Sequence, residues 1–372
     1  SSDVCSSDLI DMGVGEPDRP AFPVTVERLA LEAGKPENRF YTDNGLGTFN
    51  QAVAGYMKRL YGVELDADTQ INHSIGSKSA LCLLPACFIN PGDVTLTTIP
   101  GYPVLGTWTR YLGGEVVSLP LTPDNDFFPD LDAVSAEQRQ RAKLLYLNYP
   151  NNPTGASATP EQLRHAVDFC LAHDIVLVSD AAYAPLNFAG SPLSVLSIPG
   201  AMDCTIELHS MSKGFNMTGW RLGWACGNTM AVDAFATVKD NADSGQFAAI
   251  QLAAAATLEQ AEQITPKICA KYSRRLDALT RMLADVGFDA TKPQGSFYLY
   301  VPIPKAADGQ PFDSGEAFSQ WLITEKLIST VPWDDAGAFV RFSATFQADD
   351  EADEQRVLDE VARRLSTTEF RF

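Results

Sequence analysis

The chain has 372 residues, of which 28 are basic and 47 acidic, so its formal net charge is −19. This excess of acid disfavours nucleic acid and anionic membranes as partners, and no apolar run approaches the roughly 20 residues of a membrane-spanning helix. The length fits two domains, or one large domain with a smaller one attached. Seven cysteines, odd in number and mostly inside apolar runs, predict unpaired thiols and a reducing, cytoplasmic compartment.

The first nine residues differ from the rest of the chain. The stretch "SSDVCSSDL" at 1–9 shows no periodicity and resembles a translated sequencing adaptor more than a protein segment. We expect residues 1–9 to be non-native or disordered, and the native sequence to begin near Ile10.

From about residue 48 onward, helical patterns alternate with short apolar runs. Apolar residues at helical spacing predict helices over 48–60, 80–93 and 161–174. Short apolar runs predict strands at 93–99, 114–121, 142–150, 174–180 and 204–210. Strands that alternate with crossover helices indicate an α/β domain with a mainly parallel sheet. Such sheets place their chemistry at the carboxyl ends of the strands.

After about residue 265 the pattern changes to that of an α+β unit. It predicts a long amphipathic helix over 267–287, strands at 295–303 and 338–345, and helices at 315–327 and 349–366. We expect the N-terminal segment to complete this unit. The sequence therefore predicts a large domain over 42–270 and a smaller, discontinuous domain made of 10–41 and 271–372.

Polar residues follow the ends of the last three strands predicted for the large domain. They are Asn152, Asp180, Tyr183, Ser210, Ser212 and Lys213. Because the carboxyl ends of parallel strands meet at one edge of the sheet, we expect these side chains to lie close together.

A second group of residues predicts a site for a phosphate. Ser77 and Lys78 form a turn before a helix, where free backbone N–H groups and the helix dipole attract an anion. The hydroxyls of Ser210 and Ser212 and the guanidinium of Arg221 complete the cradle. A lysine beside a phosphate, with a carboxylate on a neighbouring strand end, is the arrangement that pyridoxal phosphate requires.

Eight motifs then occur in an order that is highly specific, although each alone is weak evidence. They are "GVGEPD", "GSKSAL", "PGYPVL", "NYPNNPTG", "SDAAY", "SMSKGFNMTGWRLGW", "KPQGSFYLY" and "FVRFS". From Ile10 onward the chain resembles the class I and II aminotransferases of fold type I, the aspartate aminotransferase superfamily. The resemblance implies a large α/β domain with a mainly parallel sheet, a smaller α+β domain, pyridoxal 5′-phosphate as cofactor, and amino-acid and 2-oxo-acid substrates.

The resemblance also implies roles at the cofactor. It makes Lys213 the residue that forms a Schiff base with the cofactor and moves protons, and Asp180 the partner of the pyridinium nitrogen. Asn152 and Tyr183 match the donors to the ring oxygen O3′, and Tyr102 matches an aromatic residue that stacks on the ring. The predicted catalytic residues are Lys213, Asp180 and Tyr183.

Further roles implied by the resemblance concern the substrate and a second subunit. Arg341 matches the arginine that binds the substrate α-carboxylate, beside the backbone of Gly15 and the side chain of Asn152. Tyr41, in "FYTDNGLG", matches a tyrosine that reaches the phosphate in the neighbouring subunit. These matches imply a homodimer with shared active sites.

Taken singly, these residues also have purely structural interpretations. Asp180 alone could cap a helix, Tyr102 could be an ordinary half-buried aromatic, and Arg341 could form a structural ion pair. His209 precedes the lysine motif and is predicted to lie in the core. The four dispersed histidines predict no metal site.

Two segments bear on the substrate. Residues 241–251 and 329–346 look most like those of LL-diaminopimelate aminotransferases, which move an amino group from glutamate to tetrahydrodipicolinate. In classical aspartate aminotransferases an arginine in the loop that corresponds to 240–246 holds the side-chain carboxylate. The sequence "DNADSGQ" here has no basic residue, so another group must bind a second carboxylate.

The sequence leaves two alternatives to a ping-pong aminotransferase. A β-lyase acting on cystathionine or cysteine S-conjugates would share every cofactor residue. A ligand-sensing domain of a transcription regulator would need a basic DNA-binding module, which neither chain end nor the net charge of −19 supplies.

Overall fold

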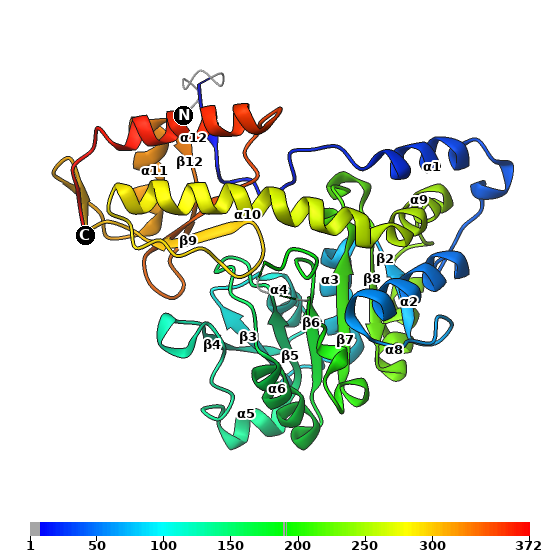
Figure 1. The fold of residues 1–372 in the computed structure, drawn as a ribbon. Helices are drawn as coiled ribbons and strands as arrows, with labels where there is room; N and C mark the ends of the chain where they lie inside the picture. The colour runs from blue at the N-terminus through cyan, green and yellow to red at the C-terminus, as the bar shows by residue number, and fades with distance from the viewer. Residues whose placement is uncertain (1–7, 189, 191) are drawn as a thin grey trace.

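The computed structural model describes residues 8–188, 190 and 192–372, so residues 1–7 of the segment expected to be non-native lie outside it. The centre is a seven-stranded sheet (Figure 1). Its strands are β2 (Ile71–Ser74), β3 (Val94–Ile99), β4 (Glu115–Pro120), β5 (Ala142–Asn148), β6 (Val176–Asp180), β7 (Thr205–Ser210) and β8 (Gly223–Gly227). They lie in the order β2-β8-β7-β6-β5-β3-β4. Only β8 runs against its neighbours, and the other adjacent pairs are parallel.

Helices cover both faces of this sheet. On one face lie α3 (Gly76–Phe88), α4 (Val104–Tyr111) and α8 (Thr229–Asp240), and on the other lies α6 (Pro160–His173). The side chains of β5 alternate between the two layers: Leu144 and Tyr146 join the first, and Leu145 and Leu147 the second. Burial on both sides explains why β5 and β6 contain runs of apolar residues.

The large part of the molecule contains further short elements. Its other helices are α2 (Gly47–Tyr61), α5 (Ala136–Arg141), α7 (Met211–Gly214) and α9 (Ala248–Glu259). Short 3-10 helices lie at Pro36–Arg39, Pro123–Asn125, Val195–Ser197, Ala201–Asp203 and Thr218–Trp220. Within the described residues, no helix is long and apolar enough to cross a membrane.

The small part is built around an antiparallel sheet in the order β13-β14-β9, of β9 (Tyr298–Pro302), β13 (Val331–Trp333) and β14 (Phe339–Ser343). Its helices are α10 (Ala261–Asp285), α11 (Gly315–Lys326) and α12 (Glu351–Leu365). β1 (Ile10–Asp11) pairs in parallel with β12 (Ile328–Ser329), so the start of the described chain joins this part. A third sheet contains β10 (Ala306–Ala307), β11 (Gln310–Pro311) and β15 (Phe370–Arg371).

Two elements connect the large and small parts. α10 is one continuous helix that passes through the predicted boundary at 270/271 (Figure 1). α1 (Pro23–Ala33) belongs to the N-terminal segment, yet it packs against α9, and the hydroxyls of Thr25 and Thr257 lie 2.6 Å apart between them. The segment 10–41 therefore contacts both parts.

The predicted fold class is confirmed, and the five predicted strands of the large domain correspond to β3 through β7. Two strands, β2 and β8, were not predicted from the sequence. β2 contains Asn72, His73 and Ser74, all of them buried, and β8 begins and ends with glycine. Polar residues and glycines are rare in buried strands, so neither segment carries the usual apolar signal.

Candidate active site

A cavity of about 330 Å³ lies at the carboxyl ends of β5, β6 and β7. Twelve of the thirteen predicted site residues line it: Gly15, Ser77, Lys78, Tyr102, Asn152, Asp180, Tyr183, Ser210, Ser212, Lys213, Arg221 and Arg341. The thirteenth, Tyr41, does not line this cavity, and 84% of its surface is exposed. The structure thus brings together residues spread over more than 300 positions, while their roles stay predictions.

One end of the cavity is built around Arg221. Its Nη1 donates to the Thr218 carbonyl oxygen at 2.6 Å and to the Ser212 hydroxyl at 3.4 Å, and neither partner carries a full charge. Gly76, at the start of α3, has a φ of +70°, and a Cβ there would overlap the Arg221 guanidinium. A guanidinium with neutral partners beside a helix N-terminus suits a bound phosphate.

Lys213 follows β7 and directs its amine into the same cavity. Its Nζ donates a hydrogen bond to the Gly15 carbonyl oxygen. Burial lowers the pKa of Lys213 from 10.5 to about 8, helped by the charges of Arg221 and Arg341 and opposed by that of Glu16. An amine with this pKa is partly neutral near physiological pH, as a nucleophile must be.

This pKa predicts how the rate of covalent capture of pyridoxal phosphate by the cofactor-free protein depends on pH. The rate should rise with pH while Lys213 loses its proton, and level off above about pH 8. An exposed lysine would continue to gain reactivity towards pH 10, because its amine stays protonated longer. Stopped-flow absorbance across a pH series measures the profile, with Nα-acetyl-lysine as the control. A rate still rising at pH 10 would show that the amine has an ordinary pKa.

Asp180 forms the base of the cavity at the end of β6. Its carboxylate accepts hydrogen bonds from the Tyr146 hydroxyl at 3.1 Å and from the Ala182 backbone N–H at 3.2 Å, both neutral donors. Burial raises the pKa of Asp180 to about 6, and the two hydrogen bonds only partly oppose this. A buried carboxylate without a hydrogen-bonded or ion-paired cation is costly, so this group suits a positively charged partner in the cavity.

Arg341, on β14, closes the opposite side. Its Nη1 donates to Asn152 Oδ1 at 2.7 Å and its Nη2 to the Gly13 carbonyl oxygen at 2.9 Å. Its Nε is buried and has no hydrogen-bond partner in the described part of the chain. A guanidinium with only neutral partners and a free N–H suits a substrate carboxylate.

Replacing Arg341 by alanine should weaken substrate binding while the cofactor content stays normal. A substrate carboxylate that loses its paired donors costs about 2 to 5 kcal/mol in apparent binding or transition-state stabilisation. Arg341→Lys is the matched control, because lysine keeps the positive charge without the planar guanidinium. Its substrate binding should lie between that of the wild type and that of Arg341→Ala. Amino-acid titrations and cofactor absorbance per chain measure both quantities. Loss of cofactor with unchanged substrate affinity would place Arg341 in the wrong part of the site.

The segment 13–16 over the cavity is anchored by Asp18. The Asp18 side chain is fully buried and pairs with Arg275 at 2.9 Å and with Lys271. Arg275 also pairs with Glu354 of α12 at 2.9 Å. This network ties the motif "GVGEPD" to α10 and α12, and so holds Gly15 beside Lys213.

Sequence reasoning gave no role to several residues that the structure places here. Glu16, Asn148, Thr218 and Tyr298 line the cavity, and Tyr146 lies beneath Asp180. Glu16, Thr218 and Tyr298 lie within the motifs quoted in the sequence analysis, and this position was the signal that could have identified them as site residues. Nothing in the pattern of β5 distinguishes Tyr146 from its apolar neighbours.

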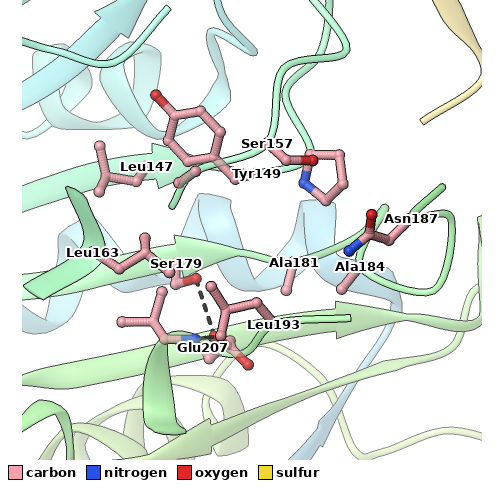
Figure 2. Close-up of a pocket in the computed structure, with 13 residues that line it drawn as sticks. Leu147, Tyr149, Ser157, Leu163, Ser179, Ala181, Ala184, Asn187, Leu193 and Glu207 are labelled. Atoms are coloured by element: carbon pink, nitrogen blue, oxygen red, sulfur yellow. Dashed lines mark hydrogen bonds between the residues drawn. The ribbon is translucent and has the colours of Figure 1, made fainter. Parts of the chain in front are cut away.

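A second cavity, of about 40 Å³, contains none of the predicted site residues (Figure 2). Its carboxylate, Glu207, accepts hydrogen bonds from Ser194 Oγ at 2.6 Å, Val195 N at 2.9 Å and Ser179 Oγ at 3.2 Å. His209 Nε2 lies 2.8 Å from it, and the His209 ring is buried against Trp224 as expected of a core residue. This carboxylate already has its partners, so we assign the cavity a structural role.

The comparisons with known proteins identify the class of protein. Residues 7–354 match the aminotransferase class I and II family, so the chain belongs to that family. It is therefore an enzyme, a pyridoxal-phosphate-dependent transaminase, as the sequence predicted.

Individual relatives and solved structures are similar to the chain over nearly its whole length. The LL-diaminopimelate aminotransferases of Methanocaldococcus jannaschii and Methanococcus maripaludis are each 51% identical to this chain, over 98% of it and 89% of the relative. Substrate-bound BacF from Bacillus subtilis matches with a TM-score of 0.90 and 31% identity, over 96% of this chain and 90% of that one. N-succinyldiaminopimelate aminotransferase from Mycobacterium tuberculosis matches with a TM-score of 0.85 and 26% identity, over 96% and 93%.

Proposed function

We propose that this transaminase is an LL-diaminopimelate aminotransferase, which transfers an amino group between LL-diaminopimelate and 2-oxoglutarate in lysine biosynthesis. The observation that carries the proposal is the 51% identity to two enzymes of that name over 98% of the chain. The predicted alternatives, a β-lyase and a ligand sensor, have no comparable support among the relatives reported above.

The cavity residues fit pyridoxal phosphate, because within the described residues the hydrogen bonds of Asp180, Arg221 and Arg341 go to neutral partners and not to a counter-charge. Arg221 would hold the phosphate, helped by the backbone N–H groups of Ser77 and Lys78 and by the hydroxyls of Ser210 and Ser212. Asp180 would keep a proton on the ring nitrogen, Asn152 and Tyr183 would donate to the ring oxygen, and Tyr102 would stack on the ring. The chemistry supplied by the bound cofactor is an electron sink for the substrate α-carbon and a temporary carrier of the amino group.

The chain's own residues then bind the substrate and move its protons. Arg341 and Asn152 hold the α-carboxylate, which both the amino acid and the oxo acid possess. Lys213, as a neutral amine, takes the proton from the α-carbon of the amino acid. Because one arginine serves both substrates in turn, the two bind alternately, as a ping-pong mechanism requires.

The far end of diaminopimelate carries a second carboxylate and a second ammonium group. Two exposed residues of opposite charge, Lys78 and Glu16, line the cavity. Since loop 240–246 has no basic residue, we assign the far carboxylate to Lys78 and the far ammonium to Glu16.

A panel of amino donors against 2-oxoglutarate tests this function. Glutamate should form fastest from LL-diaminopimelate, and more slowly from aspartate or lysine. Glu16→Gln should raise KM for LL-diaminopimelate and lower it for aspartate, because aspartate brings a second carboxylate but no far ammonium. Equal rates for all donors would reject the substrate. Pyruvate and ammonia released from a β-substituted amino acid without any acceptor would favour a lyase.

We also propose a homodimer in which Tyr41 reaches the other subunit's site. Phe40 and Tyr41 are 61% and 84% exposed, an unusual placement for two adjacent aromatic side chains. Thr42 fixes this segment to the neighbouring loop through a hydrogen bond to the Gln246 carbonyl oxygen at 2.8 Å. An ordered, exposed aromatic pair suits a contact with a second copy of the chain.

Mixed dimers test the shared site. Tyr41→Phe removes one hydrogen bond to a charged group, worth about 1.5 to 3 kcal/mol, so this homodimer should be largely empty at limiting cofactor. The Lys213→Ala homodimer should be inactive. Refolding the two together creates one site with both wild-type residues, and activity should rise well above that of either parent. If verified mixed dimers are no more active than the average of the parents, Tyr41 does not serve the partner's site.

Two further proposals concern organisation and compartment. We propose that the chain forms a large domain over 42–270 and a small, discontinuous domain made of 10–41 and 271–372. The helix α10 connects the two.

We also propose a cytoplasmic location, which the unpaired state of all six cysteines within the described residues supports.

A further inference from the structure

Tyr298 connects two parts of the site that have separate proposed roles. It lies on β9, in the same face as Arg341 on the paired strand β14, and only 2% of its surface is exposed. The Arg341 guanidinium carbon lies 3.9 Å from the centre of the Tyr298 ring. The Tyr298 hydroxyl lies 3.0 Å from that of Tyr183. One side chain thus contacts both the carboxylate-binding arginine and the tyrosine proposed to donate to the cofactor.

Its ring stabilises the position of Arg341. A guanidinium over an aromatic face gains from the negative charge of that face, and the gain grows with burial, which is nearly complete for both Arg341 and Tyr298. Arg341 donates hydrogen bonds to Asn152 and Gly13, and its guanidinium carbon also lies over the Tyr298 ring. A carboxylate ligand therefore meets a guanidinium already held in place.

Its hydroxyl determines the direction of the Tyr183 hydroxyl. Burial raises the pKa of both phenols, so both are neutral and each has one proton to donate. Arg341 partly opposes this shift at both rings, whereas Glu16 and Tyr102 raise the pKa of Tyr298. In a pair of neutral hydroxyls one donates and the other accepts. If Tyr183 donates into the cavity, Tyr298 must donate to Tyr183.

The packing around the hydroxyl restricts its position. A Cβ on Gly15 would overlap the Tyr298 oxygen, so the absence of a side chain at Gly15 makes room for it beneath segment 13–16. The two tyrosine rings meet edge to face, 5.6 Å apart. The contact is therefore supported by segment 13–16 and by the packing of the two rings.

We propose that Tyr298 is a positioning residue with two separable parts: its ring holds Arg341 for the substrate carboxylate, and its hydroxyl directs that of Tyr183 towards the cofactor ring oxygen. The proposal rests on the roles of Arg341 and Tyr183 in the proposed function.

The hydroxyl is tested by the pH titration of the bound cofactor's visible absorbance. With weaker donation from Tyr183, the negative charge on the cofactor's ring oxygen is less stabilised. The proton that this oxygen shares with the Lys213 nitrogen is then held more tightly and is lost at higher pH. Tyr298→Phe should raise the midpoint by about 0.5 to 1 pH unit, the equivalent of one net hydrogen bond, with KM unchanged within about twofold. Tyr300→Phe is the matched control: Tyr300 lies on the same strand, and its hydroxyl has no hydrogen-bond partner among the described residues. Its midpoint should not move.

The ring is tested by Tyr298→Leu, which removes both parts. It should show the same midpoint shift and, in addition, a rise of about 3- to 30-fold in KM for both the amino acid and the oxo acid. Unchanged KM in this variant overturns the ring's role. An unchanged midpoint in Tyr298→Phe, while Tyr183→Phe raises it, overturns the hydroxyl's role alone. If Tyr183→Phe also leaves the midpoint unchanged, the proposed function of Tyr183 fails together with the inference.

Discussion

Replacing Lys213 by alanine should remove transaminase activity by several orders of magnitude while the protein remains folded. Lys213 directs its Nζ into the cavity, and its pKa of about 8 supplies a neutral amine near physiological pH. Alanine has no group that can take the α-proton of the substrate, and no amine that can hold the cofactor covalently. Activity, visible absorbance of the bound cofactor and exchange of the substrate α-proton with solvent measure the three consequences.

The control for this variant is Lys267→Ala, which removes an exposed lysine of α10 outside the cavity. It should keep wild-type activity and absorbance. The Lys213→Ala protein should still take up pyridoxal phosphate without a covalent bond, because Arg221, Ser210 and Ser212 are unchanged. Substantial activity in Lys213→Ala would show that another group moves the α-proton.

Replacing Asp180 should have the second largest effect. Asp180 is a buried carboxylate whose hydrogen-bond donors, Tyr146 and Ala182, are both neutral. Without its charge a protonated ring nitrogen would be buried unpaired, at a cost of about 3 to 5 kcal/mol, or about 10² to 10⁴ in rate. Asp180→Ala should therefore slow α-proton exchange far more than it weakens substrate binding.

Two comparisons separate this role from a structural one. Asp180→Asn keeps the shape and should also be slow, because the lost charge is what matters. Tyr146→Phe removes one donor to Asp180 but keeps its charge, so exchange should fall much less. Near-normal exchange in Asp180→Ala would mean that another residue pairs with the ring nitrogen.

The sequence predicted those parts of the fold that have a strong local signal. β5 and β6 contain apolar runs, and β3 and β7 alternate aliphatic with polar residues, so each carries a recognisable strand pattern. β8 has no such run, and Asn72 and His73 of β2 are polar residues buried by tertiary packing. A local pattern does not show which polar residues the rest of the chain will bury.

The site likewise contains features that the sequence predicted and features that it did not. The local pattern of a phosphate cradle and the family motifs together identified twelve residues that the structure brings to one cavity. They did not identify the contacts among residues distant in sequence. The bond between Tyr183 and Tyr298 joins residues 115 positions apart, and that between Arg341 and Asn152 joins residues 189 apart. Such contacts depend on how the small part packs on the large one.

The predicted role of Tyr41 is also one that the contacts within a single chain do not reveal. The resemblance implies a role at a phosphate, yet in the single chain its side chain is exposed and does not line the cavity. A role that depends on a second subunit has no signal in the contacts of one chain. The mixed-dimer experiment therefore tests the predicted role of Tyr41.

Borohydride reduction of the protein loaded with pyridoxal phosphate, followed by peptide mapping, tests most directly whether this cavity is the active site. Two lysines line the cavity, Lys78 and Lys213, and reduction makes the covalent bond to the cofactor permanent. We expect one cofactor per chain, attached to Lys213 in the peptide that contains "SMSKG". A label on Lys78, or on a lysine outside the cavity, would contradict the assignment of Lys213 and the roles built around it.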